Sequence, residues 1–207
     1  MSNEPIVYVV DDDEAVRDSL EILLETSGFR ARSFASALAF LDAAGTLPPG
    51  CLVADVRMPE MDGLELQERL SAAGHRFPVI IITGHGDVPI AVRAMKAGAV
   101  DFIEKPFANE TVLESIKLAL ARLEQSSEQD AASSEANARL SLLTPRERQV
   151  LEGLVSGLPN KTIAYDLEIS PRTVEIYRAR VMDKMQAGSL PELVRLALAA
   201  GVAPKSA

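Results

Sequence analysis

The first 124 residues alternate short apolar runs with amphipathic stretches, and this alternation limits the possible folds more than any other feature of the chain. The runs expected to be strands are residues 6–10, 31–34, 51–54, 79–83 and 101–105. Three of them are continuously apolar, as strands of a sheet covered on both faces must be. The pattern predicts an α/β fold, a (βα)5 doubly wound parallel sheet.

The stretches between these runs carry apolar residues at helical spacing, so that they fall on one face of each expected helix. Val88, Val92 and Met95 form one such face. Glycines 28, 74 and 98 follow the expected helix ends, and Asp13, Asp87 and Asn109 are expected to cap the helix starts.

From Thr144 onward the sequence contains only helical signals. Thr144-Pro-Arg-Glu147 predicts a capping box with proline at the first helical position. Further helices are expected over residues 160–167 and 170–185, and a closing helix is expected to end near Ala200. Helices of this length in about 60 residues suit a small all-α helix-turn-helix domain.

Residues 125–139 contain no apolar side chain larger than alanine, so they cannot contribute to a hydrophobic core. We therefore expect a linker at 125–140 between domains at 1–124 and 141–207. The segment has no glycine or proline and is rich in helix-favouring residues, so a helical spacer and a flexible one are both open.

Charge is distributed unevenly. Residues 1–124 hold 11 Lys and Arg against 20 Asp and Glu, whereas residues 140–207 hold 9 against 7. A mildly basic second domain fits a polyanionic partner.

With one cysteine and two histidines, any metal site is expected to use oxygen ligands. The sequence has no signal peptide and no apolar segment of membrane-spanning length, so we expect a cytoplasmic protein without membrane contact.

Polar residues follow the expected strands at one edge of the sheet. Asp11 and Asp12 follow the first run, Asp55 the third, and Thr83 and Lys105 end the fourth and fifth. Three neighbouring carboxylates repel one another unless a cation offsets their charge, and an all-oxygen site suits Mg²⁺. Asp55 is then a candidate nucleophile that forms an acyl phosphate, with Lys105 offsetting charge and Thr83 donating to a phosphoryl oxygen. Taken singly, Thr83 also fits the role of an ordinary strand-end residue, and Lys105 also fits that of a solvated surface cation.

These residues resemble a response-regulator receiver domain over about residues 5–124. The resemblance is carried by Asp11-Asp12, the segment Asp55-Val-Arg-Met-Pro-Glu-Met-Asp-Gly63, Thr83-Gly84 and Lys105-Pro106-Phe107. It implies a flavodoxin-like fold and phosphorylation of Asp55. It also implies Mg²⁺ bound by Asp12, Asp55 and the main-chain carbonyl of Arg57, with Asp11 acting through water, and a cis Lys105–Pro106 bond.

The same resemblance implies a switch. A phosphoryl group on Asp55 can draw Thr83 inward and leave room for Phe102 to turn in behind it, although Phe102 also fits an ordinary core position. Receivers of this kind pair through the face formed by residues 87–98 and 101–105. The candidates for that homodimer contact are Ile90, Val92, Lys96 and Asp101.

The second domain resembles the LuxR/FixJ-type helix-turn-helix over residues 141–200. Apolar residues recur at helical spacing between Val174 and Met185, and four cations oppose two acids on that helix. A charge excess this small by itself also fits a solvated face. Glu175 stands where many relatives carry lysine, and it could accept from cytosine. The candidates for DNA contact are Asn160, Lys161, Arg172, Thr173, Glu175, Arg178 and Lys184.

The domain order and the segment Pro171-Arg-Thr-Val-Glu are most similar to the FixJ subfamily of two-component response regulators. The resemblance implies a non-enzymatic transcription activator that binds promoter DNA, switched by a FixL-like sensor histidine kinase and commonly tied to nitrogen fixation. RNA polymerase is a further candidate partner.

Three other classes are weighed against this one. A haloacid-dehalogenase-type phosphatase needs a second aspartate where Arg57 stands, and a flavodoxin-like cofactor carrier needs a phosphate loop after the first strand. A receiver that works without phosphate would keep full activity in an Asp55→Asn variant.

Overall fold

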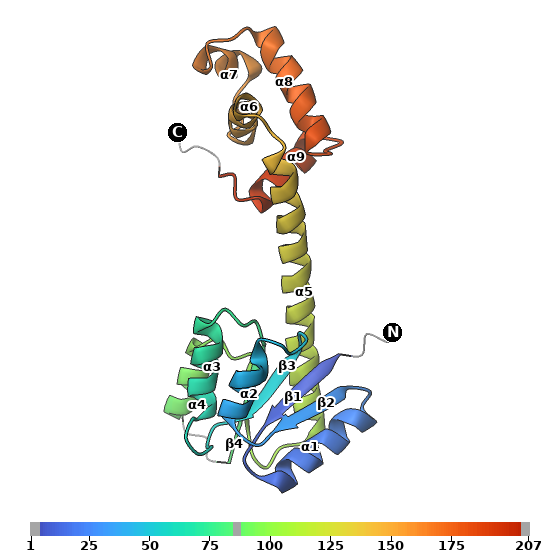
Figure 1. The fold of residues 1–207 in the computed structure, drawn as a ribbon, viewed down its shortest axis with the longest axis vertical. Helices are drawn as coiled ribbons and strands as arrows, with labels where there is room; N and C mark the ends of the chain where they lie inside the picture. Colours follow the sequence, from blue (N-terminus) through green and yellow to red (C-terminus); the bar gives the residue numbers. More distant parts are fainter. Residues whose placement is uncertain (1–4, 85–87, 204–207) are drawn as a thin grey trace. The chain divides into compact units, whose positions relative to one another are not determined.

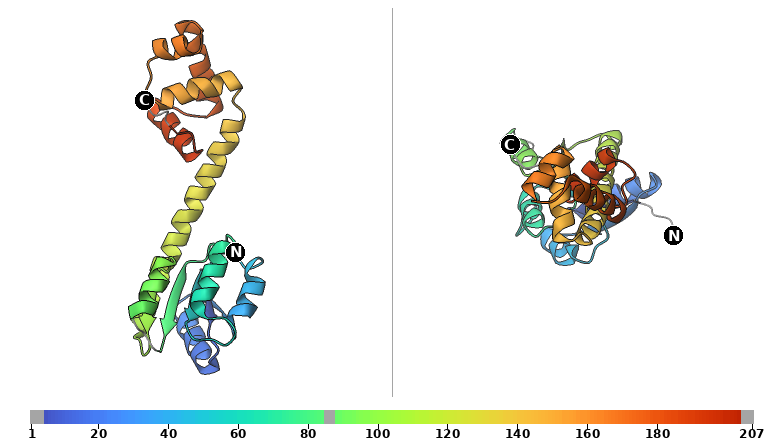
Figure 2. Two further views of the ribbon diagram at one scale, coloured as in Figure 1. Left: turned by 90° about the vertical axis from the view of Figure 1, so that its left-hand side faces the viewer. Right: turned by 90° about the horizontal axis from the view of Figure 1, so that it is seen from above.

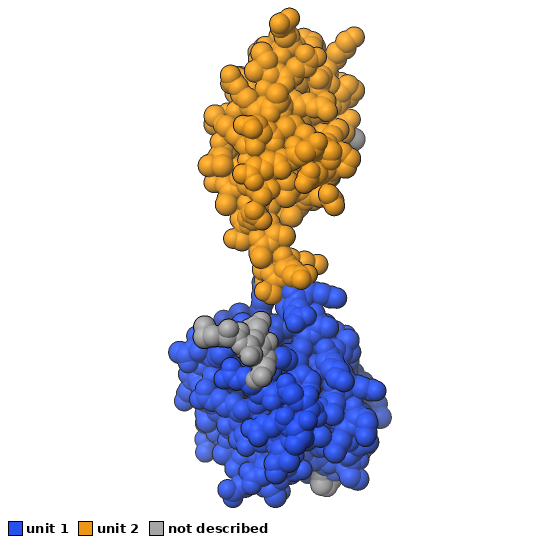
Figure 3. Space-filling model, turned by 90° about the vertical axis from the view of Figure 1, so that its right-hand side faces the viewer, with its two compact units in different colours: residues 1–125 blue, residues 126–207 orange. Residues whose placement is uncertain are grey.

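The computed structural model describes residues 5–84 and 88–203. It divides into two compact units, Met1–Gln125 and Ser126–Ala207 (Figure 3). Each unit has a hydrophobic core of its own. Asp87, expected as a helix cap, lies outside the described residues.

The first unit is built on a parallel sheet with the strand order β2-β1-β3-β4-β5 (Figure 1). This order confirms the doubly wound sheet expected from the sequence. The strands are β1 (Ile6–Val10), β2 (Arg30–Phe34), β3 (Cys51–Asp55), β4 (Val79–Thr83) and β5 (Asp101–Glu104). The helices are α1 (Glu14–Thr26), α2 (Ala37–Ala44), α3 (Gly63–Ala72), α4 (Val88–Lys96) and α5 (Asn109–Ser141).

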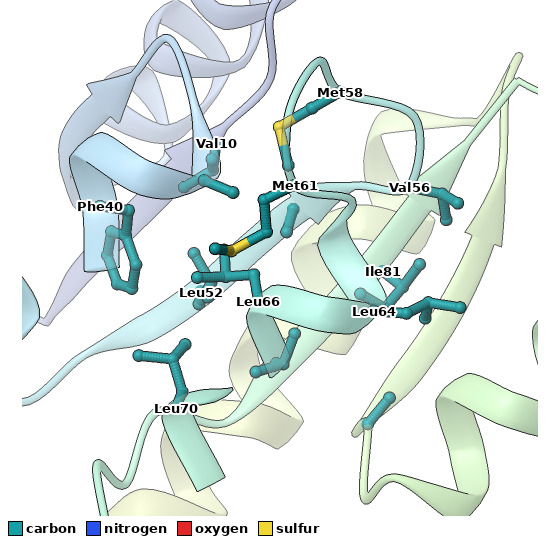
Figure 4. Close-up of a cluster of buried hydrophobic side chains, with 14 of the residues drawn as sticks. Val10, Phe40, Leu52, Val56, Met58, Met61, Leu64, Leu66, Leu70 and Ile81 are labelled. Carbon is teal, nitrogen blue, oxygen red and sulfur yellow. The ribbon is translucent and has the colours of Figure 1, made fainter. Parts of the chain in front are cut away.

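Successive residues of the inner strands point into different layers, because side chains alternate across a strand. Val7 and Val9 of β1 belong to the cluster that packs with α1 and α5. Tyr8 and Val10 belong to the cluster that packs with α2 and α3, part of which is drawn in Figure 4. Both faces of the sheet are therefore covered, which explains the continuous apolar runs.

Local capping sets where several of these helices begin. The Asp13 side chain accepts from the backbone N–H of Ala15 at 2.9 Å, which confirms it as the cap of α1. Asp62 caps α3 in the same way through the N–H of Glu65. Asn109, expected as a cap, is instead the first residue of α5.

The apolar face of α4 predicted from helical spacing is exposed. Val88, Val92 and Met95 are 77%, 45% and 49% exposed, whereas Ala94 is fully buried. The small Ala94 lets α4 lie close to the sheet, and the larger apolar residues point outward. Helical spacing located the apolar face correctly, but it does not specify what covers that face.

The second unit is helical, with α6 (Pro145–Val155), α7 (Asn160–Asp166), α8 (Pro171–Lys184) and α9 (Leu190–Ala199). The predicted capping box at the start of α6 is present. The helices enclose a cluster that includes Val150, Leu151, Val174, Val181 and Leu193, all fully buried.

One helix contributes to both cores. Near its start, Val112 and Ile116 of α5 are buried in the first unit, and near its end Leu140 is buried in the second. The interval expected to be a linker lies within this helix. None of the described helices is long and apolar enough to cross a membrane.

We expect Gly63→Ala to destabilise the first unit. A Cβ at Gly63 would collide with the main-chain carbonyl oxygen of Asp55, and backbone atoms cannot move aside cheaply. The free energy of unfolding should fall by about 1–3 kcal/mol, as measured by urea denaturation. The control is Gly45→Ala, where the nearest atom would be a ring carbon of His75 at 3.8 Å. Equal stability of the two variants would contradict the expectation.

Candidate functional site

The parallel strands bring polar residues from four positions to one edge of the sheet. Asp11 directly follows β1, Asp55 is the last residue of β3, Thr83 is the last residue of β4, and Lys105 directly follows β5. The order of strands places β1 and β3 side by side at the point where the winding direction reverses. Ligand sites of open α/β sheets form at this point.

Lys105 joins the two buried carboxylates of this edge. Its Nζ lies 2.8 Å from Oδ2 of Asp11 and 2.7 Å from Oδ1 of Asp55. Asp11 is 4% exposed and Asp55 is 8% exposed, so these ion pairs are shielded from water. Shielding strengthens the attraction, but it also makes an uncompensated charge costly.

Backbone groups fix the orientation of both carboxylates. The N–H of Arg57 donates to the second oxygen of Asp55. The N–H of Asp13 donates to Oδ1 of Asp11 at 2.9 Å. In addition, Arg17 donates from its guanidinium to the main-chain oxygen of Asp11 at 2.8 Å. The sequence analysis missed Arg17, whose only signal was its position one turn into the helix that starts at this edge.

The ionisation of the two charged partners responds to burial in different ways. Burial raises the pKa of Asp55 above its ordinary value, although the hydrogen bond and charge of Lys105 oppose this. Burial lowers the pKa of Lys105, but Asp11 and Asp55 outweigh this effect and raise it, so the ammonium keeps its charge at neutral pH. Because two buried carboxylates share one ammonium, this edge of the sheet favours the binding of a further positive charge.

The third carboxylate expected here is not part of this cluster, because the side chain of Asp12 is exposed. Within residues 5–84 and 88–203, no three acidic, histidine or cysteine side chains are close enough to hold a metal ion. The chemistry of the donors nevertheless fits a hard cation, since Asp11 and Asp55 present buried oxygen atoms beside a surface carboxylate.

Thr83 and Phe102 lie on neighbouring strands beside this edge. Thr83 is fully buried, and Phe102 is half-buried against the cluster that contains Ile81. The peptide bond between Lys105 and Pro106 is cis, as the resemblance implied.

The α4–β5 face presents only part of the expected pairing set. Val92 and Lys96 are exposed on α4. Ile90 is partly buried against the core, and the Asp101 carboxylate accepts a hydrogen bond from the hydroxyl of Ser115. The exposed Val88 and Met95 extend this face.

In the second unit, α8 is amphipathic. Val174 and Val181 are fully buried, whereas Arg172, Glu175 and Arg180 are exposed. The first turn of α8 is capped by Ser170, whose hydroxyl accepts from the N–H of Thr173 and also pairs with the Thr173 hydroxyl.

The other candidates for DNA contact differ in exposure. Lys161 is exposed, while Asn160 and Arg178 are half-buried. Lys184 has an internal role: its Nζ donates to Oε2 of Glu147 at 2.7 Å and to the main-chain oxygen of Leu142 at 3.1 Å. We therefore drop Lys184 from the proposed DNA contacts.

Glu147 ties two helices of the second unit together, α6 and α8. It is 2% exposed, caps α6 through the N–H of Thr144, and binds Lys184 at the end of α8. Burial raises its pKa, but the hydrogen bonds from Lys184 and Thr144 outweigh burial and leave the pKa below the ordinary value. Arg139 near the end of α5 adds a second tie, by donating to the main-chain oxygen of Met185 at 3.2 Å. The sequence analysis missed these ties, because the two partners of each tie are far apart in the chain.

Comparisons with known proteins cover both units. Residues 7–117 match the response regulator receiver domain family, and residues 141–197 match the luxR family of bacterial regulatory proteins. The transcriptional regulatory protein FixJ of Azorhizobium caulinodans is 59% identical over 96% of this chain and 94% of its own length. FixJ of Bradyrhizobium diazoefficiens is 54% identical over 98% of both chains.

Two solved structures extend the likeness to the fold. The response regulator StyR has a TM-score of 0.80 at 42% identity, covering 94% of this chain and 98% of StyR. Full-length FixJ from B. japonicum has a TM-score of 0.61 at 53% identity, covering 98% of this chain and all of that one.

We expect Glu147→Gln to destabilise the second unit by about 1–3 kcal/mol at neutral pH, because a buried lysine contact loses its counter-charge. Since the folded pKa of Glu147 is lowered, its ionised form stabilises the fold above the unfolded pKa, and this contribution disappears as pH falls through the folded pKa. Thermal unfolding from pH 7 down to about pH 3 should show a constant gap between variant and wild type above about pH 5 and a closing gap below about pH 4.5, the ordinary pKa of a glutamate.

The matched control for this experiment is Glu135→Gln. Glu135 pairs with Arg139 at the surface, where its side chain is 66% exposed. This change should cost less than about 1 kcal/mol. A Glu147→Gln deficit that does not change with pH would contradict the assignment.

Proposed function

The chain belongs to the FixJ-type response regulators, with a receiver domain and a luxR-family DNA-binding domain, and on this premise we propose that phosphorylation of Asp55 controls binding to promoter DNA. A sensor histidine kinase is the phosphoryl donor. The similarity to FixJ further supports a FixL-like kinase as the partner. It also supports nitrogen-fixation genes as the targets. The chain acts as a regulator of transcription and not as an enzyme.

The observation that carries the proposal is the buried Asp55 carboxylate with Lys105 at 2.7 Å. In the transfer, a carboxylate oxygen of Asp55 forms a bond to phosphorus while the bond from phosphorus to the donor's histidine nitrogen breaks, and that nitrogen keeps the bonding electrons. Lys105 offsets the charge that accumulates on the phosphoryl oxygens. The backbone N–H of Arg57 holds the carboxylate in place.

A magnesium ion would be held by Asp12, Asp55 and the main-chain carbonyl of Arg57, with Asp11 through water. When bound, it neutralises phosphoryl oxygens and orients them for transfer. The buried oxygen atoms of Asp11 and Asp55, and the raised pKa of Asp55, support a demand for positive charge at this edge.

The proposed switch runs from Asp55 to the α4–β5 face. Phosphorylation adds close to two negative charges and new acceptor oxygens, toward which the Thr83 hydroxyl turns. Phe102 pairs in register with Ile81 on β4, the strand that ends at Thr83. A movement of Thr83 therefore changes the surroundings of the Phe102 ring. The exposed apolar residues of α4 then support receiver pairing, with Ile90, Val92, Lys96 and Asp101 as the proposed contacts.

We assign residues 1–124 to the receiver, 125–140 to the linker and 141–207 to the DNA-binding domain. The division between compact units after Gln125 supports the first boundary.

Pairing of two receivers would bring two DNA-binding domains to adjacent half-sites, so that two weak DNA contacts combine through tethering. Asn160, Lys161, Arg172, Thr173, Glu175 and Arg178 are the proposed contacts on each copy. An activator must also engage RNA polymerase, which we propose as a further partner.

The first test is phosphorylation by a small-molecule donor. Incubating the wild type with acetyl phosphate and Mg²⁺ should add the mass of one phosphoryl group and convert monomer to dimer, as followed by intact mass and light scattering. Asp55→Asn should show neither change. Asp18→Asn, which alters an exposed acid on α1, should behave as wild type. Failure of the wild type to take up a phosphoryl group would overturn the proposal.

The second test concerns the DNA contacts. Arg172→Ala or Arg178→Ala should weaken binding of the phosphorylated protein to its operator by about 1–3 kcal/mol while thermal unfolding stays unchanged. The matched control is Arg195→Ala, which removes an exposed cation from α9 instead of α8. Unchanged affinity in both α8 variants would contradict the assignment of α8 as the reading helix.

A further inference from the structure

Met95 differs in exposure from the other methionines that the structure describes. Met95 is 49% exposed on α4. Met58, Met61 and Met185 are at most 8% exposed. Met182 is half-buried against the core of the second unit. Met95 is therefore the methionine of the described residues that a dissolved reagent reaches most easily.

The surroundings of Met95 are mainly apolar. It lines a shallow hollow on α4 together with Ala91, Val92 and Lys96. Val88, one turn before Val92, continues the apolar face and is 77% exposed. Such a face gains stability when another apolar surface covers it, and the receiver pairing proposed above supplies that surface.

The thioether of a methionine is an apolar group that mild oxidants make polar. A hydroperoxide transfers one oxygen atom to the sulfur: the O–O bond breaks, an S=O bond forms, and the rest of the peroxide leaves as an alcohol or as water. The sulfur loses two electrons, which the peroxide takes up. The sulfoxide oxygen is a strong hydrogen-bond acceptor, so burying it against valine and alanine side chains is costly.

The single thiol of the chain does not compete for such an oxidant. Cys51 lies in β3 and is fully buried. Burial also raises the pKa of its thiol, so the thiolate, which is the form that reacts with peroxides, is scarce at neutral pH. Among the sulfur atoms of the described residues, a peroxide therefore reacts first with that of Met95.

We propose that Met95 is a reversible oxidation site that controls receiver pairing. Its sulfoxide keeps the phosphorylated protein monomeric, so that phosphorylation of Asp55 no longer leads to tight binding of the operator. This inference rests on the proposed pairing through the α4–β5 face, and it gives that face a second chemical input, a hydroperoxide. Pairing in turn covers Met95 and protects it from oxidation.

The test oxidises the full-length protein with hydrogen peroxide, which is then removed with catalase. Peptide mass spectrometry gives the fraction of each methionine that has gained one oxygen atom. Acetyl phosphate and Mg²⁺ are added next, and light scattering measures pairing. We expect oxidation at Met95 to weaken pairing by about tenfold or more, while intact mass shows that the phosphoryl group is still taken up. Methionine sulfoxide reductase with a dithiol should restore pairing, because the dithiol is oxidised to a disulfide and the oxygen leaves as water.

Met95→Leu is the decisive variant, because leucine keeps the apolar contact but has no sulfur. It should pair on phosphorylation as the wild type does, and peroxide should leave its pairing unchanged. Met182→Leu is the matched control, since it removes the half-buried methionine and should still lose pairing on oxidation. Met1, which lies outside the described residues, is present in all three proteins and cannot explain a difference among them.

A second measurement uses the expected protection. Wild-type protein is phosphorylated first and then treated with peroxide. The rate of oxygen uptake at Met95 should fall in step with the paired fraction, whereas the rate at Met182 should not change.

Three results would overturn the inference. One is full pairing of wild-type protein that is oxidised at Met95, and another is a Met95→Leu protein that loses pairing to peroxide as readily as the wild type. The third is a rate of Met95 oxidation that is the same in paired and unpaired protein. If wild-type protein takes up a phosphoryl group but does not pair before any peroxide is added, the proposed pairing itself fails and the inference fails with it.

Discussion

The Lys105 ammonium between the carboxylates of Asp11 and Asp55 is the interaction on which the receiver edge depends. Without a cation, two buried negative charges would face each other with little water to screen them, and one would have to take up a proton. With it, Asp55 has a counter-charge at one carboxylate oxygen and the N–H of Arg57 at the other. The Lys105 ammonium is also within reach of a phosphoryl group attached to Asp55, because it already contacts an Asp55 oxygen at 2.7 Å.

The second unit uses the same physical device for a different purpose. Glu147 is buried and bound by Lys184, so a single ion pair links the start of α6 with the end of α8. Arg139 binds the carbonyl that closes α8, which ties the last turns of α5 to the same point. The C-terminal end of α8 is thereby held in place, while Arg172 and Glu175 near its start stay exposed. In the first unit the buried charges meet at the edge of the sheet, and in the second they link two helices.

Several elements could be read directly from the sequence because their signals are local. The strands follow from continuous apolar runs, the starts of α1 and α6 from Asp13 and the Thr144 capping box, and the acidic edge from the rule that parallel strands end together. Other features were beyond local reasoning. The spacing of Val88, Val92 and Met95 indicated an apolar face of α4, but only the packing shows that this face is exposed, because Ala94 allows the other side of the helix to lie against the sheet.

The sequence by itself determined the two domains, the order of their elements and the residues available for chemistry, since these depend on periodicity and on neighbours along the chain. The tertiary structure alone decided which of those residues meet. It left Asp12 and the apolar face of α4 at the surface, and it placed Lys184 on Glu147. The reason is that a charge pair or an exposed patch depends on distances through space, and these distances exist only once the helices have packed.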